Sequence, residues 1–156
     1  MTKIDFYVLA DEAVLQRYLF ACRLIEKAYR LGNRVFVHGS SQQQLDKLDQ
    51  LLWTFRANSF LPHRCYPLAA TSADTEQAAL AEGEIILSTE LPPEPYHDVM
   101  VNLSNQVPDF FSRFQRVSEI VVQHEQIKAA TRSNFRYYRE RGYEVKTHQL
   151  AQQAAH

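Results

Sequence analysis

Two patterns of apolar residues alternate along the chain, one with the period of strands and the other with the period of helices. Short runs of aromatic and branched residues predict strands over 3–9, 34–38, 84–88, 98–103 and 118–123, with a further edge strand over 143–148. Apolar residues that recur every three or four positions predict helices over about 11–31, 40–53, 108–113 and 125–141. This alternation indicates an α/β fold with three layers, α/β/α, around a mainly parallel central sheet.

Residues suited to helix ends support these boundaries. Asp11 can cap the first helix, and Ser40 or Ser41 can cap the second, because their side chains accept hydrogen bonds from free backbone amides. Gly32 follows the first helix, where the chain favours a residue that tolerates positive φ, and the last helix is expected to stop at Gly142. Both observations are consistent with the strand and helix order given above.

The segment between the second helix and the third strand has no clear periodicity. We expect irregular structure over 54–70 and a polar, alanine-rich surface loop over 71–83. No linker interrupts the rest of the pattern. The sequence therefore predicts one domain over 1–148, followed by a flexible polar tail over 149–156.

Composition excludes several classes of protein. The chain has 156 residues, is 46% hydrophobic and 22% charged, and has a formal net charge of −1, so a globally basic nucleic-acid binder is not expected. The N-terminus does not read as a signal peptide, and no apolar run is long enough to span a membrane. Cys22 and Cys65 are expected to be reduced thiols, which is typical of a cytoplasmic protein.

The glycine count argues against a nucleotide site, although the fold pattern resembles that of nucleotide-binding domains. The four glycines are too widely spaced to form a phosphate-binding loop. Ser40-Ser41 lacks the second glycine of a nucleophile elbow, and Lys128 stands where a metalloprotease motif beginning at His124 would need histidine. We therefore expect no cofactor, no metal and no intrinsic catalysis. A small nucleotide-dependent enzyme on a degenerate α/β sheet stays open as an alternative.

The predicted last helix concentrates positive charge. Its segment 125–141 has five basic residues against two acidic ones, and Lys128, Arg132 and Arg136 are spaced four apart, so that they share one helix face. Such a row suits an acidic peptide with a hydrophobic end, or single-stranded nucleic acid that also stacks on aromatic rings such as Phe135. A solvated basic face is the plain alternative. The near-neutral net charge of the whole chain favours the peptide.

These residues also resemble the chi subunit family of bacterial DNA polymerase III. The resemblance runs in order from the first strand to about Tyr143, and residues 48–53 (LDQLLW) with 59–63 (SFLPH) form its most specific block. Two other segments carry it, Phe6-Tyr7 in the first strand and a set in the last helix comprising Lys128, Arg132, Phe135, Arg136 and Tyr138 ahead of Arg141-Gly142-Tyr143.

The resemblance implies a nucleotide-binding-like fold without a nucleotide site and an accessory, non-catalytic subunit of a DNA-directed DNA polymerase, which is a nucleotidyltransferase complex. The implied partners are the psi subunit, the acidic C-terminal tail of single-stranded DNA-binding protein, which ends in a phenylalanine carboxylate, and indirectly the clamp loader. Direct DNA contact would be weak or indirect, and no membrane is involved.

Two sets of site residues follow from the resemblance. The tail site would comprise Trp53, Val121, Lys128, Arg132, Phe135 and Arg136, and the psi interface would comprise Phe60, Pro62 and His63. Arg132 would bind the terminal carboxylate and Lys128 would attract the upstream acids, while Trp53 and Val121 would wall a pocket for the terminal ring. The family often has Tyr and Lys where this chain has Phe135 and Arg136. Without the resemblance, Trp53 at the end of a Leu-rich helix and Val121 in a buried strand are interpreted as core positions, and Phe60 is equally consistent with an inward position.

Overall fold

The computed structural model describes residues 1–57, 60–65 and 85–150. Its helices are α1 (Val14–Arg30), α2 (Gln42–Thr54) and α4 (Glu125–Glu140), with a 3₁₀-helix over Phe111–Arg113. Its strands are β1 (Lys3–Leu9), β2 (Val35–His38), β3 (His63–Cys65), β4 (Ile85–Ser88), β5 (Val99–Asn102), β6 (Arg116–Val121) and β7 (Val145–Leu150).

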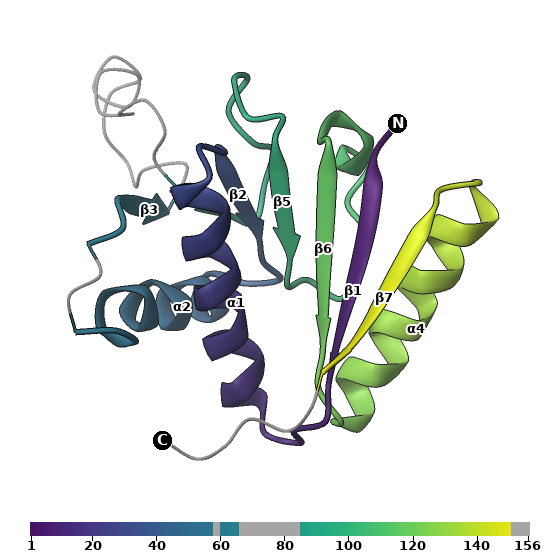
Figure 1. The fold of residues 1–156 in the computed structure, drawn as a ribbon, viewed down its shortest axis with the longest axis horizontal. Coiled ribbons are helices and arrows are strands. Elements are labelled where there is room, and N and C mark those ends of the chain that lie inside the picture. The colour runs from purple at the N-terminus through teal and green to yellow at the C-terminus, as the bar shows by residue number, and fades with distance from the viewer. Residues whose placement is uncertain (58–59, 66–84, 151–156) are drawn as a thin grey trace.

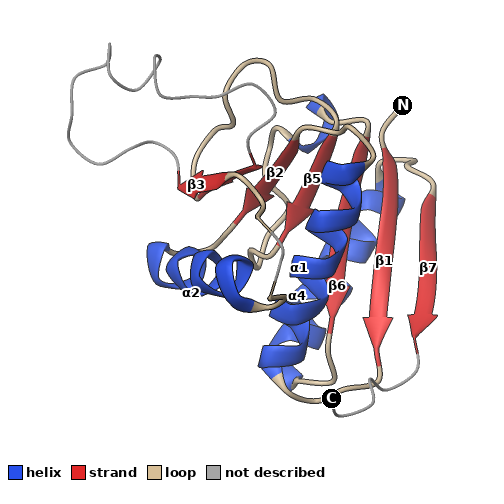
Figure 2. Cartoon of the chain, turned by 60° about the vertical axis from the view of Figure 1, so that its left-hand side comes forward, coloured by secondary structure: helices blue, strands red, loops and turns tan. Residues whose placement is uncertain are grey.

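The strands form one parallel sheet in the order β3-β4-β2-β5-β6-β1-β7. Helices α1 and α2 cover one face of this sheet and α4 covers the other, as Figures 1 and 2 show. The three-layer α/β/α architecture predicted from the sequence is therefore confirmed. In the described residues the sheet is parallel throughout, which is consistent with helical crossovers on both faces.

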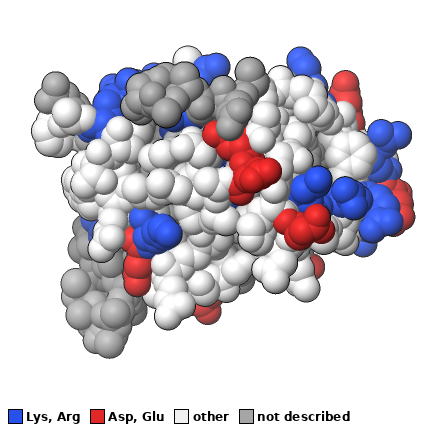
Figure 3. All heavy atoms as spheres, turned by 90° about the horizontal axis from the view of Figure 1, so that it is seen from below, with Lys and Arg blue, Asp and Glu red and all other residues white. Residues whose placement is uncertain are grey.

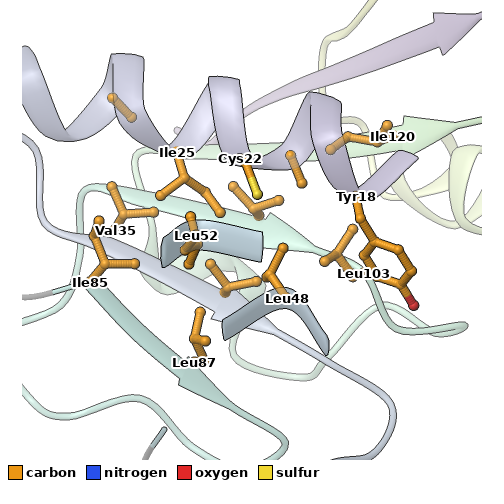
Figure 4. Packing of buried hydrophobic residues seen from close by; sticks show 14 of the residues in the cluster. Tyr18, Cys22, Ile25, Val35, Leu48, Leu52, Ile85, Leu87, Leu103 and Ile120 are labelled. Carbon is orange, nitrogen blue, oxygen red and sulfur yellow. The ribbon is translucent and has the colours of Figure 1, made fainter. Parts of the chain in front are cut away.

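A layer of aliphatic side chains holds α1 and α2 on the sheet. Cys22 and Ile25 of α1 pack with Leu48 and Leu52 of α2 over Leu87 and other strand residues, and all of these side chains are fully buried (Figure 4). Each buried aliphatic side chain contributes about 1.5–3 kcal/mol to the free energy of folding. This layer fixes α2 near the β3–β4 end of the sheet.

The layer beneath α4 is mainly aromatic. Tyr138 of α4 packs edge-on against Phe6 of β1 and against Phe111 of the 3₁₀-helix, with ring centroids 6.0 and 5.3 Å apart. Phe36 and Phe114 stack at 5.8 Å in the same cluster. Edge-to-face and offset-stacked rings fix relative orientation as well as burying area, so α4 has a defined position on the strands β1, β6 and β7.

Most of the predicted helix ends are confirmed, and one is wrong. Ser41 accepts a hydrogen bond from the Gln44 amide at 3.2 Å, while Gly32 and Gly142 have φ of 93° and 82°. Asp11, however, does not cap α1, whose N-cap is Ala13, two residues later, with no side-chain cap. The carbonyl of Asp11 instead accepts from the Gln123 amide at 2.8 Å, which holds this segment in an extended conformation.

The short helix predicted over 108–113 is a 3₁₀-helix of three residues, Phe111–Arg113, and the other differences concern strands. β3 falls inside the segment expected to be irregular, and it has three residues, too few for a period to be visible in the sequence. β7 ends at Leu150, so the first two residues of the predicted tail belong to the sheet. The predicted loop 71–83 and tail residues 151–156 lie outside the described part of the chain. No helix among the described residues has the length and apolar character needed to cross a membrane.

Candidate functional site

A hollow of about 440 Å³ lies between α4 and the strands β6, β1 and β7. We call it the α4 hollow, and the residues that line it are Phe6, Val8, Val121, Gln123, Lys128, Thr131, Arg132, Phe135, Thr147 and Gln149. The strands contribute most of the apolar side chains and α4 contributes the cations. The hollow therefore combines an apolar floor with a positively charged rim.

The floor follows from the alternation of side chains along parallel strands. Phe6 and Val8 are two residues apart in β1 and face α4, and Val121 of the neighbouring β6 faces the same way. Phe135 of α4 meets Phe6 edge-on, with ring centroids 5.2 Å apart. The floor is thus built from four apolar side chains on three elements, and it is large enough to take an aromatic or branched side chain from a partner.

The rim is formed by the cationic row of α4. Lys128 and Arg132 both line the hollow, one helical turn apart, and neither forms an ion pair with any residue that the structure describes. Arg136 continues the row by one more turn and is exposed, although it does not line the hollow. Figure 3 shows Lys and Arg side chains, with some Asp and Glu among them, at the right-hand end of the molecule, the side on which Figure 1 places α4. These cations are therefore available to an anionic partner.

A buried carboxyl beneath the hollow ties α4 to the sheet. Glu119 of β6 has no exposed surface and accepts hydrogen bonds from Tyr138 Oη at 2.7 Å, Asn102 Nδ2 at 2.8 Å and Asn134 Nδ2 at 3.3 Å. Burial raises the pKa of Glu119, and the three donors together with the nearby Arg17 guanidinium oppose that shift. The network joins β5, β6 and α4, so it fixes the helix that carries the rim cations.

The structure brings together four of the six residues expected in the tail site. Val121, Lys128, Arg132 and Phe135 line one hollow, with Arg136 outside it on the same row. Trp53 is not part of it: it lies on α2, which packs on the opposite face of the sheet. The expectation that Trp53 and Val121 wall one pocket was therefore wrong, because the two side chains belong to different layers.

Trp53 belongs instead to a second exposed surface. Its ring lies 4.5 Å from that of His63 and it is 53% exposed, while Phe60 is 80% exposed. His63, which was expected at the psi interface, is itself buried: Nε2 lies 3.2 Å from Asp49 Oδ1, and Nδ1 lies 2.6 Å from the Leu61 carbonyl oxygen. His63 thus packs against the Trp53 ring from inside, while Phe60 is exposed and Pro62 is partly exposed in the segment that leads into β3.

Several lining residues were missed by the sequence analysis. Phe6 and Val8 could have been found, because their spacing of two in a predicted strand places them on one face. Thr147 and Gln149 carry no such signal, since their place depends on β7 pairing with β1 at one register. Thr131 could have been found because it lies three residues after Lys128 and four before Phe135, spacings that share one helix face.

The loop after β2 is filled by the chain's own side chains. Gln44 Oε1 accepts from the Ser40 amide at 2.8 Å. A Cβ on Gly39 would lie 2.6 Å from Leu45 Cδ2, so the loop is closed against the helix behind it. In the described residues, no group of three His, Cys, Asp or Glu side chains could hold a metal ion.

The chain is similar to a set of bacterial replication proteins. The family model described as "DNA polymerase III chi subunit, HolC" matches residues 1–146. A protein of Pseudomonas aeruginosa named DNA polymerase III subunit chi is 40% identical over 150 residues, covering 96% of this chain and 98% of that protein. Proteins of the same name from Haemophilus influenzae and Escherichia coli are 26% and 22% identical, and the alignments cover 92% and 94% of this chain and 94% and 97% of those proteins.

The family model covers Trp53, Phe60 and every residue that lines the α4 hollow except Thr147 and Gln149, which lie beyond residue 146. These similarities place the chain among accessory subunits of the replicative polymerase. With a family match over nearly its whole length and a relative 40% identical along that length, the chain belongs to the DNA polymerase III chi subunit family.

Proposed function

We propose that this replication accessory subunit binds the acidic C-terminal tail of single-stranded DNA-binding protein in the α4 hollow. The observation that carries the proposal is the pair Lys128 and Arg132, free of ion pairs within the described chain, on the rim of an apolar floor. A chain end with a phenylalanine ring and a carboxylate needs both features at once, an apolar recess and a cation beside it.

Each part of the tail has a matching group. The terminal ring would enter the floor beside Phe6 and Phe135, where aromatic contacts favour an edge-to-face arrangement. Arg132 would bind the terminal carboxylate with its planar, two-pronged guanidinium, and Lys128 would attract the acidic residues upstream as a compact charge. Arg136 would extend the attraction along the row. The hollow therefore selects a chain end over an internal acidic segment.

The second surface supports a separate partner. Trp53 and Phe60 are exposed aromatic side chains on the opposite face of the sheet from α4, and exposed aromatic residues are frequent anchors of protein interfaces. We assign this surface, with Pro62, to the psi subunit, whose apolar helix face would cover the two rings. Through psi the chain would reach the clamp loader, so that one protein would link the replicase to coated single-stranded DNA in the cytoplasm without catalysis of its own.

The proposal is tested by titrating the full chain with a fluorescent synthetic peptide that carries several aspartates and a C-terminal phenylalanine. We expect saturable binding that weakens with added salt, because the rim cations act partly through long-range attraction. Amidation of the terminal carboxylate should weaken binding at least about tenfold, since a hydrogen bond to a charged group contributes about 1.5–3 kcal/mol. Equal affinity for the free and amidated peptides would contradict the proposal.

Two further assays on the same protein distinguish this function from the alternatives. If the basic row of α4 bound single-stranded DNA directly, naked oligonucleotide would shift in a gel without any binding protein. If the sheet held a nucleotide, ATP or GTP would raise the melting temperature, because a ligand that binds only the folded state stabilises it. We expect neither result when the oligonucleotide or the nucleotide is added at the concentration at which the peptide saturates the α4 hollow.

A further inference from the structure

The edge strand β7 is unusually open for the edge of a sheet. Edge strands are commonly short or interrupted by proline or a bulge, because their free peptide groups can pair with another chain. The opposite edge, β3, has three residues, whereas β7 has six, contains no proline and pairs with β1 without interruption from Ile4 to Leu9. β7 thus offers a regular template along its outer side.

The hydrogen bonds of the sheet show which peptide groups of β7 face outward. The Ile4 amide donates to the Glu144 carbonyl at 3.4 Å. Because peptide groups alternate in direction along a parallel strand, Lys146 and His148 also face β1. Val145, Thr147 and Gln149 then direct both N–H and C=O away from the sheet, and no described residue bonds to these outward groups.

The outward peptide groups lie directly beside the α4 hollow. Thr147 and Gln149, two of the residues with outward backbone groups, also line the hollow with their side chains. Figure 1 shows β7 running alongside α4 over this stretch. A strand added to β7 would direct every second side chain toward α4, so backbone pairing and occupation of the hollow are compatible in one extended peptide.

The charges around this edge favour an acidic segment. Lys128 and Arg132 face it from α4, and Lys146 is exposed on β7 itself. None of the three has an ion pair within the described ranges, and Glu144, just ahead of β7, is the nearest acid of the strand segment. An extended backbone with acidic side chains therefore satisfies both the unpaired peptide groups and the unpaired cations.

We propose that the acidic tail binds as an added strand on the outer edge of β7, with Thr147 and Gln149 supplying backbone hydrogen bonds. This inference rests on the function proposed for the α4 hollow and adds a second recognition element, the backbone of β7. The upstream acidic residues would then be held by main-chain pairing as well as by charge. Specificity would arise from an extended conformation that a folded acidic surface does not present.

Pairing of the peptide with β7 is tested by residue-resolved amide hydrogen exchange on the full chain, with and without the peptide. We expect the Thr147 and Gln149 amides to exchange at least about tenfold more slowly in the complex, which corresponds to one added hydrogen bond of ordinary strength. The Lys146 and His148 amides are the internal control, because they already bond to β1 and should change little. Peptide binding with unchanged exchange at Thr147 and Gln149 would overturn the inference and leave the proposed function intact.

A set of peptides in which single backbone amides are replaced by esters gives an independent readout that leaves the protein unaltered. Each ester removes one N–H donor and keeps the side chain. Pairing with β7 predicts that affinity falls about tenfold at alternate positions and within twofold at the positions between them. A flat profile would overturn the inference. If the unmodified peptide itself fails to bind, both the proposed function and this inference are wrong.

Discussion

Phe6 and Tyr7 are consecutive in β1 but contact helices on opposite faces of the sheet. Phe6 meets Phe135 of α4 with ring centroids 5.2 Å apart, and Tyr7 meets Phe20 of α1 at 5.3 Å. Neighbouring residues of β1 therefore contact the α4 hollow on one face of the sheet and the α1 layer on the other. Since α2 and the surface at Trp53 lie on the α1 side, the two proposed interfaces can be perturbed separately.

Arg132→Ala should weaken binding of the acidic tail peptide by about 2–5 kcal/mol, because the terminal carboxylate would lose its charged partner inside the complex. Arg132 is exposed and has no ion pair among the described residues, so the free energy of unfolding should change by less than about 0.5 kcal/mol. Peptide titration and urea unfolding measure the two quantities.

Lys47→Ala is the matched control for Arg132→Ala. Lys47 is an exposed cation on α2, on the opposite face of the sheet, so its removal changes the net charge equally. If Lys47→Ala weakened the peptide as much as Arg132→Ala does, attraction to the whole molecule would explain binding and the assignment of the α4 hollow would be wrong.

Trp53→Ala should separate the two partners. The side chain is 53% exposed and lies outside the α4 hollow, so we expect tail affinity within about twofold of the wild-type value. Binding of psi should weaken by about 2 kcal/mol, which is typical of an aromatic anchor at an interface. Co-purification and calorimetry with psi provide the measurement, with Leu91→Ala as a control at an exposed apolar residue elsewhere. A large loss of tail binding in Trp53→Ala would return Trp53 to the tail site.

Local periodicity was sufficient to predict that the cations of α4 share one face, but it was not sufficient to predict where the side chain of Trp53 lies. Lys128, Arg132 and Arg136 share one helix face wherever the helix packs in the fold, because residues spaced four apart lie on the same side of any α-helix. The location of Trp53 depends on which face of the sheet α2 covers, and this is set by strand order. The order β3-β4-β2-β5-β6-β1-β7 results from tertiary packing, and no local pattern contains it.

The same distinction explains what was missed beneath the hollow. Glu119 was placed in a strand, but its role requires Asn102 of β5 and Asn134 of α4 to converge on it across long sequence separations. Conversely, positive φ at Gly32 and the end of the last helix at Gly142 were predicted correctly, because both depend only on the local requirements of a helix end. Apart from the Asp11 cap, features fixed within about one turn of helix were predictable from this sequence, whereas the strand order and the contacts that depend on it were not.

Gly39→Ala should destabilise the fold without changing the tail site. An added Cβ would lie 2.6 Å from Cδ2 and 2.9 Å from Cγ of Leu45, so this fully buried side chain would have to move within the core. We expect a loss of about 1–3 kcal/mol in the free energy of unfolding, as for other overpacked positions. Denaturant titration gives this value, and unchanged peptide affinity is the control. A neutral effect on stability would show that the loop after β2 is looser than the structure indicates.

Glu119→Gln should change how stability depends on pH. Burial raises the pKa of Glu119 above its ordinary value of 4.5, so between that value and the folded-state pKa the native protein keeps a proton that the unfolded chain has lost. The carboxyl therefore contributes stability that is complete below pH 4.5 and is lost as pH rises through the folded-state pKa. The neutral amide of the variant has no such dependence.

The measurement is the unfolding free energy of wild type minus that of Glu119→Gln across a pH series, in which the titration of all other groups largely cancels. We expect this difference to fall as pH rises above 4.5, by up to about 1.4 kcal/mol per pH unit within the window, and then to level off. A difference that rises with pH would mean that the donors Asn102, Asn134 and Tyr138 outweigh burial. In that case the network would stabilise the ionised carboxylate, and α4 would be held more firmly at neutral pH than in acid.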